Sequence, residues 1–251
     1  MTTDKKRCLV LGGSGVLGQQ LCRTLLDNGA RLAFTYFNNE DAAQSLKKSY
    51  PDSDVKIFKM DARDLNELDS VVVKAVEELG GLDALIHCIG IGVTQSEADS
   101  NQHMRMTEIT PASWDEMFQI NVRSLFFAAA AALPALKESA NGQIVLTGSI
   151  DGEKAVPSPI HYASTKAALG GLVRSMTKEL GEFQIKVNMV TPGIMTDGVS
   201  RTLPKDMREE YKKHCGFKRE GRPDEFASLM AWLALENTYI TGRSIIVDGA
   251  L

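Results

Sequence analysis

The segment from Ser149 to Lys166 holds the side chains of this sequence that are best suited to catalysis. Tyr162 and Lys166 are four residues apart, so they project from one face if the segment is helical. A tyrosine hydroxyl has an ordinary pKa of about 10, and an adjacent ammonium stabilises its phenolate form. We therefore expect Lys166 to lower the pKa of Tyr162 until the hydroxyl can exchange a proton near neutral pH. Ser149, which follows the apolar run 143–148, would add a second hydroxyl at the same place.

Tyrosine–lysine pairs also occur on helices without a catalytic role, so the surrounding elements decide between the two interpretations. Apolar runs typical of strands alternate with segments of helical periodicity along the whole chain. This alternation predicts a single Rossmann domain over residues 1–251, with a doubly wound parallel sheet of about seven strands and helices on both faces. A long helix from Pro111 is expected to bend at Pro134. The expected strands are 7–11, 31–37, 54–60, 82–90, 142–149, 183–193 and 243–249.

Three glycines mark the connection between the first strand and the first helix. Gly12, Gly15 and Gly18 are spaced three residues apart. In a doubly wound fold this turn lets the backbone approach a dinucleotide pyrophosphate, which the N–H groups at the helix N-terminus then bind. A tight turn without a ligand is the alternative. The position of the glycines, in the first strand–helix connection of an alternating chain, favours a nicotinamide dinucleotide.

The end of the second strand bears on which nicotinamide cofactor is used. An acidic residue there binds an unphosphorylated ribose and repels a 2′-phosphate. The strand ends at Tyr36, Phe37 and Asn38, no carboxylate occurs before Glu40, and no arginine stands beside it. This pattern favours NADP(H) over NAD(H), with Asn38 as a neutral partner.

Composition limits the other classes of function. The chain has 251 residues, 43% of them hydrophobic, and a net charge of −4 without a block of like charge. This balance argues against nucleic-acid or membrane-surface binding. No signal peptide or membrane span is indicated, so we expect a cytoplasmic protein. Neither a disulfide framework nor a metal site is expected, because the cysteines lack the spacing for either: Cys8, Cys22, Cys88 and Cys215.

Taken together, these motifs resemble the short-chain dehydrogenase/reductases, and most of all the 3-oxoacyl-[acyl-carrier-protein] reductases. The resemblance spans nearly the whole chain, from the first strand to the last. It depends on the glycine turn, the Ser and Tyr-x-x-x-Lys set, an upstream Asn and a Pro-Gly pair: Asn121, Ser149, Tyr162, Lys166 and Pro192–Gly193.

The resemblance implies a role for each of these residues. Tyr162 would be the general acid/base, and Lys166 would lower its pKa and hold the nicotinamide ribose. Ser149 would bind the substrate carbonyl, and Asn121 would hold a water that passes protons to the lysine. The implied cofactor-binding residues are Gly12, Ser14, Gly15, Val16, Leu17, Gly18, Tyr36, Asn38, Asp61, Ala62, Cys88, Gly90, Tyr162, Lys166, Pro192, Gly193, Ile194 and Thr196.

For function, the resemblance implies NADPH-dependent reduction of a ketone to a secondary alcohol. The substrate would be a 3-oxoacyl thioester, on acyl carrier protein or CoA, in fatty acid or polyketide biosynthesis. It also implies a homotetramer or homodimer and an acyl carrier protein as partner. Two alternatives stay open: an NAD-dependent alcohol or sugar dehydrogenase of the same family, and a nucleotide-bound scaffold or redox sensor that has lost catalysis.

Three departures from the family pattern stand out. In the glycine turn Leu11 and Val16 replace a threonine and a glycine, and Gly15 stands where many NADP-dependent members carry an arginine. The fourth strand ends in His87 and Cys88 in place of two asparagines, and we expect His87 to be structural rather than catalytic. The ends of the two long helices carry lysines where carrier-protein reductases often show arginines: Lys137 and Lys186.

Two irregular segments, 91–110 and 194–221, should set the substrate, because ligands of open α/β sheets bind beyond the carboxyl ends of the strands. Segment 194–221 also has the glycines that a mobile lid needs. Several side chains here would line an adaptable apolar pocket or simply pack the loops: His103, Met104, Met106, Met195 and Met207.

Overall fold

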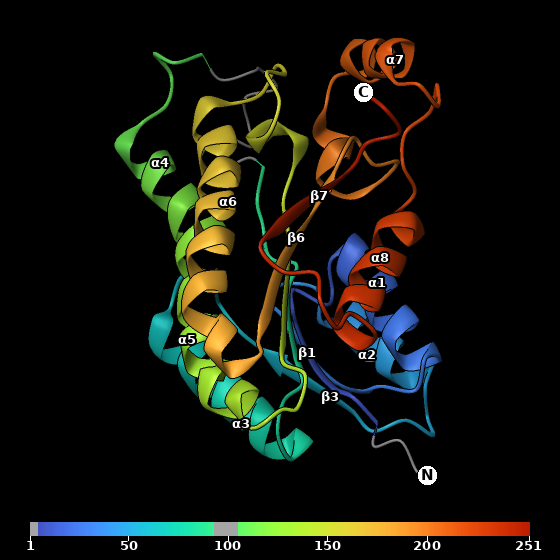
Figure 1. The fold of residues 1–251 in the computed structure, drawn as a ribbon. Coiled ribbons are helices and arrows are strands. Elements are labelled where there is room, and N and C mark those ends of the chain that lie inside the picture. Colours follow the sequence, from blue (N-terminus) through green and yellow to red (C-terminus); the bar gives the residue numbers. More distant parts are fainter. Residues whose placement is uncertain (1–4, 93–104) are drawn as a thin grey trace.

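The computed structural model of the chain describes residues 5–92 and 105–251, and it contains a seven-stranded parallel sheet covered by helices on both faces (Figure 1). The predicted fold class is confirmed. The strands are β1 (Arg7–Leu11), β2 (Arg31–Tyr36), β3 (Val55–Lys59), β4 (Ala84–His87), β5 (Gln143–Thr147), β6 (Lys186–Pro192) and β7 (Arg243–Val247). Their order is β3-β2-β1-β4-β5-β6-β7, so the direction of winding reverses between β1 and β4. Sheets of this kind bind ligands at the carboxyl ends of the strands beside that reversal.

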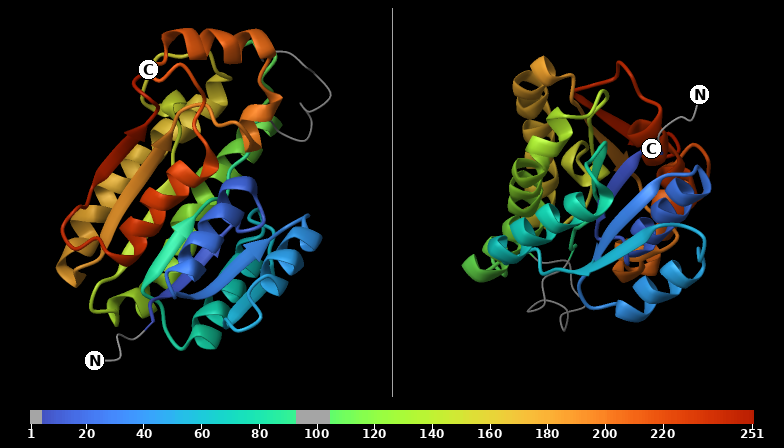
Figure 2. Two further views of the ribbon diagram at one scale, coloured as in Figure 1. Left: turned by 90° about the vertical axis from the view of Figure 1, so that its right-hand side faces the viewer. Right: turned by 90° about the horizontal axis from the view of Figure 1, so that it is seen from below.

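The helices form two layers (Figures 1 and 2). One layer holds α1 (Val16–Asp27), α2 (Glu40–Lys48) and α8 (Pro223–Leu235), and the other holds α3 (Leu65–Leu79), α4 (Pro111–Phe118), α5 (Ser124–Lys137) and α6 (Ile160–Leu180). A further helix, α7 (Lys205–His214), lies beyond the carboxyl ends of the strands, where the left view of Figure 2 shows it at the top.

Alternate side chains of each central strand enter two separate cores. In β1, Cys8 and Val10 pack towards α1 and α8, whereas Leu9 and Leu11 pack towards α3 and α5. All four side chains are fully buried. A strand covered on both faces needs apolar side chains on both, which explains why the strands appear in the sequence as continuous apolar runs rather than alternating ones.

The long helix expected from Pro111 is interrupted before Pro134. Thr110 begins it with a capping box to Ser113, and one turn of π-helix at Gln119–Arg123 separates α4 from α5. Pro134 lies inside α5, which continues past it. The change of helix type is therefore at Asn121 and not at Pro134. A π-turn adds one residue to the helix, as is frequent at functional sites, and here it carries Asn121, which is 1% exposed.

Together these helical pieces, Pro111–Lys137, are long and apolar enough by length and composition to cross a membrane. A helix inside a globular core passes the same test. In this fold the buried side chains of α5, among them Leu125, Ala128 and Ala132, pack in one core with α3 and the sheet.

Candidate active site

Helix α6 presents Tyr162 and Lys166 on one face, as their spacing predicts. The Lys166 side chain is buried, and its Nζ lies 5.6 Å from the centroid of the Tyr162 ring. The same ammonium donates a hydrogen bond of 3.3 Å to the carbonyl of Thr147, the last residue of β5. Lys166 thus joins α6 to the carboxyl end of the central sheet.

Ser149 reaches this pair because a short turn packs very closely on α6. It follows β5 and caps the 3-10 turn η2 (Ile150–Gly152). A Cβ on Gly152 would lie 2.5 Å from the carbonyl carbon of Lys166, so only glycine permits this approach. The turn brings the Ser149 hydroxyl into hydrogen-bonding contact with Tyr162.

The electrostatics of the pair differ from the prediction in one respect. Burial raises the pKa of Tyr162, the charge of Asp151 raises it further, and the hydrogen bond with Ser149 acts in the opposite direction. Burial lowers the pKa of Lys166 to about 8, against the opposite influence of Asp151 and Cys88. The predicted lowering of the Tyr162 pKa by Lys166 is not found, because desolvation of the buried phenol dominates.

Asn121 ties the segment after β4 to α6. Its Oδ1 accepts a hydrogen bond of 2.8 Å from the Ile91 amide, and its Nδ2 donates to the Ile91 carbonyl at 3.0 Å and to Thr165 Oγ1 at 3.1 Å. A Cβ on Gly90 would lie 3.2 Å from Lys166 Nζ. Asn121 therefore fixes the wall of the site beside Lys166. Its role in holding a water stays a prediction.

His87 has a structural environment, which agrees with its expected role. It is 1% exposed, and its Nε2 lies 2.9 Å from the hydroxyl of Ser124, which itself donates to the Ile120 carbonyl at 2.6 Å. Because a serine has one proton to donate, Nε2 must be the donor to Ser124. Burial, followed by the charge of Lys166, lowers the pKa of His87 to about 3, so the ring stays neutral.

The glycine turn between β1 and α1 is tightly packed. Gly12 has φ +83°, and its amide donates a 2.9 Å hydrogen bond to Thr35 Oγ1 on β2. A Cβ on Gly18 would lie 2.2 Å from the Gly12 carbonyl oxygen. Helix α1 begins without a side-chain cap or an acidic residue in its first turn, so its N-terminal amides can bind an anion. Thr35, which anchors the turn, was not among the predicted residues.

The remaining predicted cofactor residues gather at the same edge of the sheet. This follows from the topology, because each of them stands at or just after the carboxyl end of a strand. Ser14 and Gly15 lie between β1 and α1, and Val16 and Leu17 begin α1. The others are Tyr36 and Asn38 at the end of β2, Asp61 and Ala62 after β3, Cys88 and Gly90 after β4, and Pro192, Gly193, Ile194 and Thr196 at the end of β6.

The end of β2 carries charges that the linear sequence did not reveal. The fold brings Arg63 from beyond β3 to within 5.3 Å of the Phe37 ring, so the expectation of no arginine beside β2 is wrong. The Arg63 guanidinium also pairs with Asp61 at 2.7 Å and holds the pKa of that carboxyl below its usual range. Burial raises the pKa of Tyr36. The charge of Glu40, and the hydrogen bond between its carboxylate and Tyr36, raise this pKa further.

The structure describes only part of the two segments that were predicted to set the substrate, 91–110 and 194–221. Residues 93–104, including His103 and Met104, lie outside the described residues. In segment 194–221, Met195 forms an isolated bridge with Gly221 and packs against the core on the α1 side. Met106 is 77% exposed. A mobile lid over 194–221 stays a prediction.

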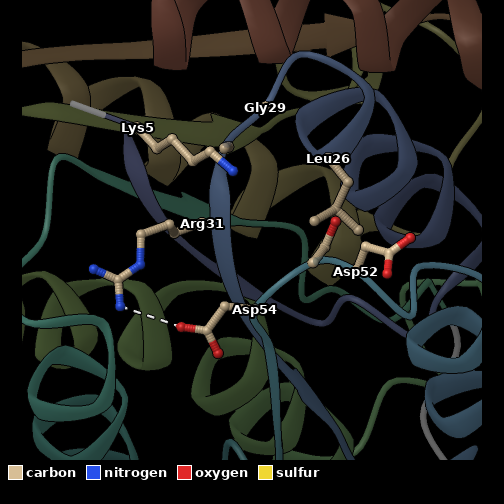
Figure 3. Close-up of a pocket in the computed structure, with 8 residues that line it drawn as sticks. Lys5, Leu26, Gly29, Arg31, Asp52 and Asp54 are labelled. Atoms are coloured by element: carbon tan, nitrogen blue, oxygen red, sulfur yellow. Dashed lines mark hydrogen bonds and ion pairs between the residues drawn. The ribbon is translucent and has the colours of Figure 1, made fainter. Parts of the chain in front are cut away.

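A cavity of about 310 Å³ lies elsewhere, at the amino ends of the strands (Figure 3). Lys5 precedes β1 and Arg31 begins β2, and Arg31 pairs with Asp54 at 3.2 Å before β3. The side chains of the candidate active site follow the opposite ends of the strands. This cavity therefore does not belong to that site.

Comparison with known sequences gives matches over the whole fold. A family model described as enoyl-(acyl carrier protein) reductase matches residues 14–251. The chain is 32% identical over 248 residues to a cyclic-di-GMP-binding biofilm dispersal mediator protein of Escherichia coli (strain K12), covering 98% of this chain and 96% of that protein. It is 28% identical over 249 residues to the 3-oxoacyl-[acyl-carrier-protein] reductase FabG of Staphylococcus aureus (strain N315), covering 98% of each.

Solved structures give a similar result. A short-chain dehydrogenase/reductase from Serratia marcescens BCRC 10948 superimposes with a TM-score of 0.88 at 30% identity, over 98% of this chain and 97% of that one. BdcA, solved in complex with NADPH, superimposes with a TM-score of 0.83 at 30% identity, over 98% of this chain and 94% of that one.

Proposed function

Since the chain belongs to the short-chain dehydrogenase/reductase family of nicotinamide-dependent oxidoreductases, we propose that it uses NADPH to reduce the ketone of a 3-oxoacyl thioester to a secondary alcohol. The observation that carries this proposal is the convergence of Ser149, Tyr162 and Lys166 at the carboxyl ends of β4 and β5, beside the glycine turn. Relatives named 3-oxoacyl-[acyl-carrier-protein] reductase support the substrate class.

The side chains of the site suit proton donation to a reduced carbonyl. A nicotinamide cofactor supplies the hydride when bound. Tyr162 carries its proton at neutral pH, as an ordinary tyrosine also does, and can give it to the more basic alkoxide that forms. Ser149 would donate a hydrogen bond to the same oxygen as its charge develops. The ammonium of Lys166 would stabilise the tyrosinate left behind.

Features of the site and one relative support NADP(H) over NAD(H). Strand β2 ends in neutral side chains, with Asn38 exposed, and Arg63 stands over Phe37. A relative at 30% identity, BdcA, was solved with NADPH. The Glu40 carboxylate near the end of β2 is already engaged, because it is hydrogen-bonded to Tyr36.

The proposed function is tested by steady-state assays on the purified protein. We expect acetoacetyl-CoA and other 3-oxoacyl thioesters to be reduced with NADPH, and kcat/KM with NADPH to exceed that with NADH by about tenfold, the effect of one charged contact to a phosphate. Faster oxidation of polyols with NAD would instead identify an alcohol or sugar dehydrogenase. Cofactor binding without turnover of any ketone or alcohol would identify a scaffold.

Gly15 provides a second test of cofactor choice. It has an ordinary extended conformation, and an added Cβ would meet only the Gly12 carbonyl oxygen, at 3.4 Å. We expect Gly15→Arg to fold normally and to improve the affinity for NADPH relative to NADH by about tenfold, because the guanidinium would face the 2′-phosphate. Fluorescence titration with both cofactors measures this ratio. Gly15→Gln is the neutral control, and an equal change for both cofactors would contradict the prediction.

Several further expectations stay predictions: docking of an acyl carrier protein, assembly into a homotetramer or homodimer, and a cytoplasmic location. Phe126 and Phe127 on α5 are 48% and 42% exposed, which supports contact with a second copy along that helix.

A further inference from the structure

The site contains a carboxylate that the Asn, Ser, Tyr and Lys set does not include. Asp151 lies in η2, where the Ser149 hydroxyl donates a short hydrogen bond to its Oδ2. The Asp151 amide in turn donates to Ser149 Oγ at 3.4 Å. The hydroxyl proposed to bind the substrate carbonyl is therefore bonded to a carboxylate before it meets any substrate.

The surrounding contacts fix Asp151 in this place. Gly152 packs its turn against the backbone of α6, as described above. The next two side chains are anchored to the carboxyl-terminal part of the chain: Glu153 accepts a hydrogen bond of 2.5 Å from Ser244, and Lys154 pairs with Asp248 at 2.6 Å. Since η2 is held on both sides, Asp151 has little freedom to turn away from the site.

Among the side chains that the structure describes, Ser149 is the one that donates a hydrogen bond to the Asp151 carboxylate. Within residues 5–92 and 105–251 no cationic side chain forms an ion pair with it, and its half-buried charge acts on Tyr162 and Lys166 instead. A serine hydroxyl has a single proton. Once Ser149 donates that proton to a substrate carbonyl, Asp151 loses this hydrogen-bond donor. Leaving a partly desolvated carboxylate without a donor costs free energy.

We propose that Asp151 accepts a hydrogen bond from a hydroxyl or ammonium group on the carbon next to the reacting carbonyl, so that the substrates are α-hydroxy or α-amino ketones. This inference rests on the proposed function, and it narrows the 3-oxoacyl class to chains that carry such a group beside the ketone. Ser149 Oγ is bonded to the Asp151 carboxylate, and it would bind the substrate carbonyl oxygen on its other side. A donor one carbon from the carbonyl would take over the bond that Ser149 gives up.

The test compares two ketones of similar size, 1-hydroxy-2-butanone and 3-pentanone. The second ketone has a methyl group where the first has its hydroxyl. For each enzyme form the ratio of the two kcat/KM values is measured with NADPH. We expect the wild-type protein to favour the hydroxyketone at least about tenfold, Asp151→Asn to reduce that ratio about tenfold, and Asp151→Leu to favour 3-pentanone. Glu182→Gln, which removes an exposed carboxylate just beyond the carboxyl end of α6, should keep the wild-type ratio.

The same preference is measured at equilibrium, from the affinity of the enzyme–NADPH complex for each ketone by NADPH fluorescence. A wild-type protein without preference in either measurement, or an Asp151→Asn variant with the wild-type ratio, would overturn the role of Asp151. Binding preference that Asp151→Asn removes, without turnover of either ketone, would support Asp151 while contradicting the proposed reduction. NADPH affinity near that of the wild type establishes that each variant is folded.

Discussion

Replacing Tyr162 with phenylalanine should lower kcat for ketone reduction by about 10²–10⁴-fold, the usual contribution of a positioned general acid. The substitution removes only the hydroxyl, which Ser149 bonds, and keeps the ring beside which Lys166 lies. NADPH affinity should stay close to that of the wild type, because the glycine turn is untouched. Stopped-flow and steady-state rates, with a fluorescence titration of NADPH, measure both quantities.

A matched control for this variant is Tyr50→Phe. Tyr50, which precedes β3, donates a 2.8 Å hydrogen bond to Asp27, the last residue of α1. This bond lies at the amino ends of the strands, away from the candidate active site. The same loss of a hydroxyl there should leave kcat unchanged. Near-wild-type reduction by Tyr162→Phe would remove Tyr162 from the mechanism and leave Lys166 or a bound water as the acid.

The strands and the Tyr162–Lys166 pair were predictable because local rules decide them. Strands buried on both faces must be apolar throughout, and residues four apart on a helix share a face. The glycine turn follows in the same way from its place between β1 and α1. Each of these inferences needs only a short window of sequence, and the structure has each element within a few residues of its predicted bounds.

Features that depend on distant contacts were not predictable. Arg63 stands beside Phe37 only because β2 and β3 are neighbours in the sheet. The raised pKa of Tyr162 depends on how completely packing excludes water, which the sequence does not state. Asp151 had a sequence signal, since it follows Ser149 by two residues, but its importance appears only when η2 packs against α6.

The glycine turn leads to the second large effect, that of Gly18→Ala. An alanine is ordinarily the better residue in a helix by about 1 kcal/mol. Here its Cβ would lie 2.2 Å from the Gly12 carbonyl oxygen and 2.9 Å from the Gly13 Cα, and these backbone atoms can move only if the turn itself moves. We expect the free energy of unfolding to fall by about 3 kcal/mol.

Two alanine variants separate this steric effect from the general behaviour of glycine. Gly171 lies in α6 with no atom within 4 Å of an added Cβ, so Gly171→Ala should raise the free energy of unfolding by about 0.5–1 kcal/mol. Gly15→Ala, which meets only one atom at 3.4 Å, should be nearly neutral. Urea denaturation measures all three variants.

NADPH titration of the same variants connects the steric argument to function. A turn displaced by the Gly18→Ala side chain would no longer present the first amides of α1 to a pyrophosphate, so affinity should fall by at least about tenfold, whereas Gly15→Ala should bind normally. If Gly18→Ala were as stable as the wild type and bound NADPH equally well, the close packing of α1 on Gly12 would not be what shapes the cofactor site. A loss of affinity confined to Gly18→Ala would instead tie cofactor binding to that single contact between helix and turn.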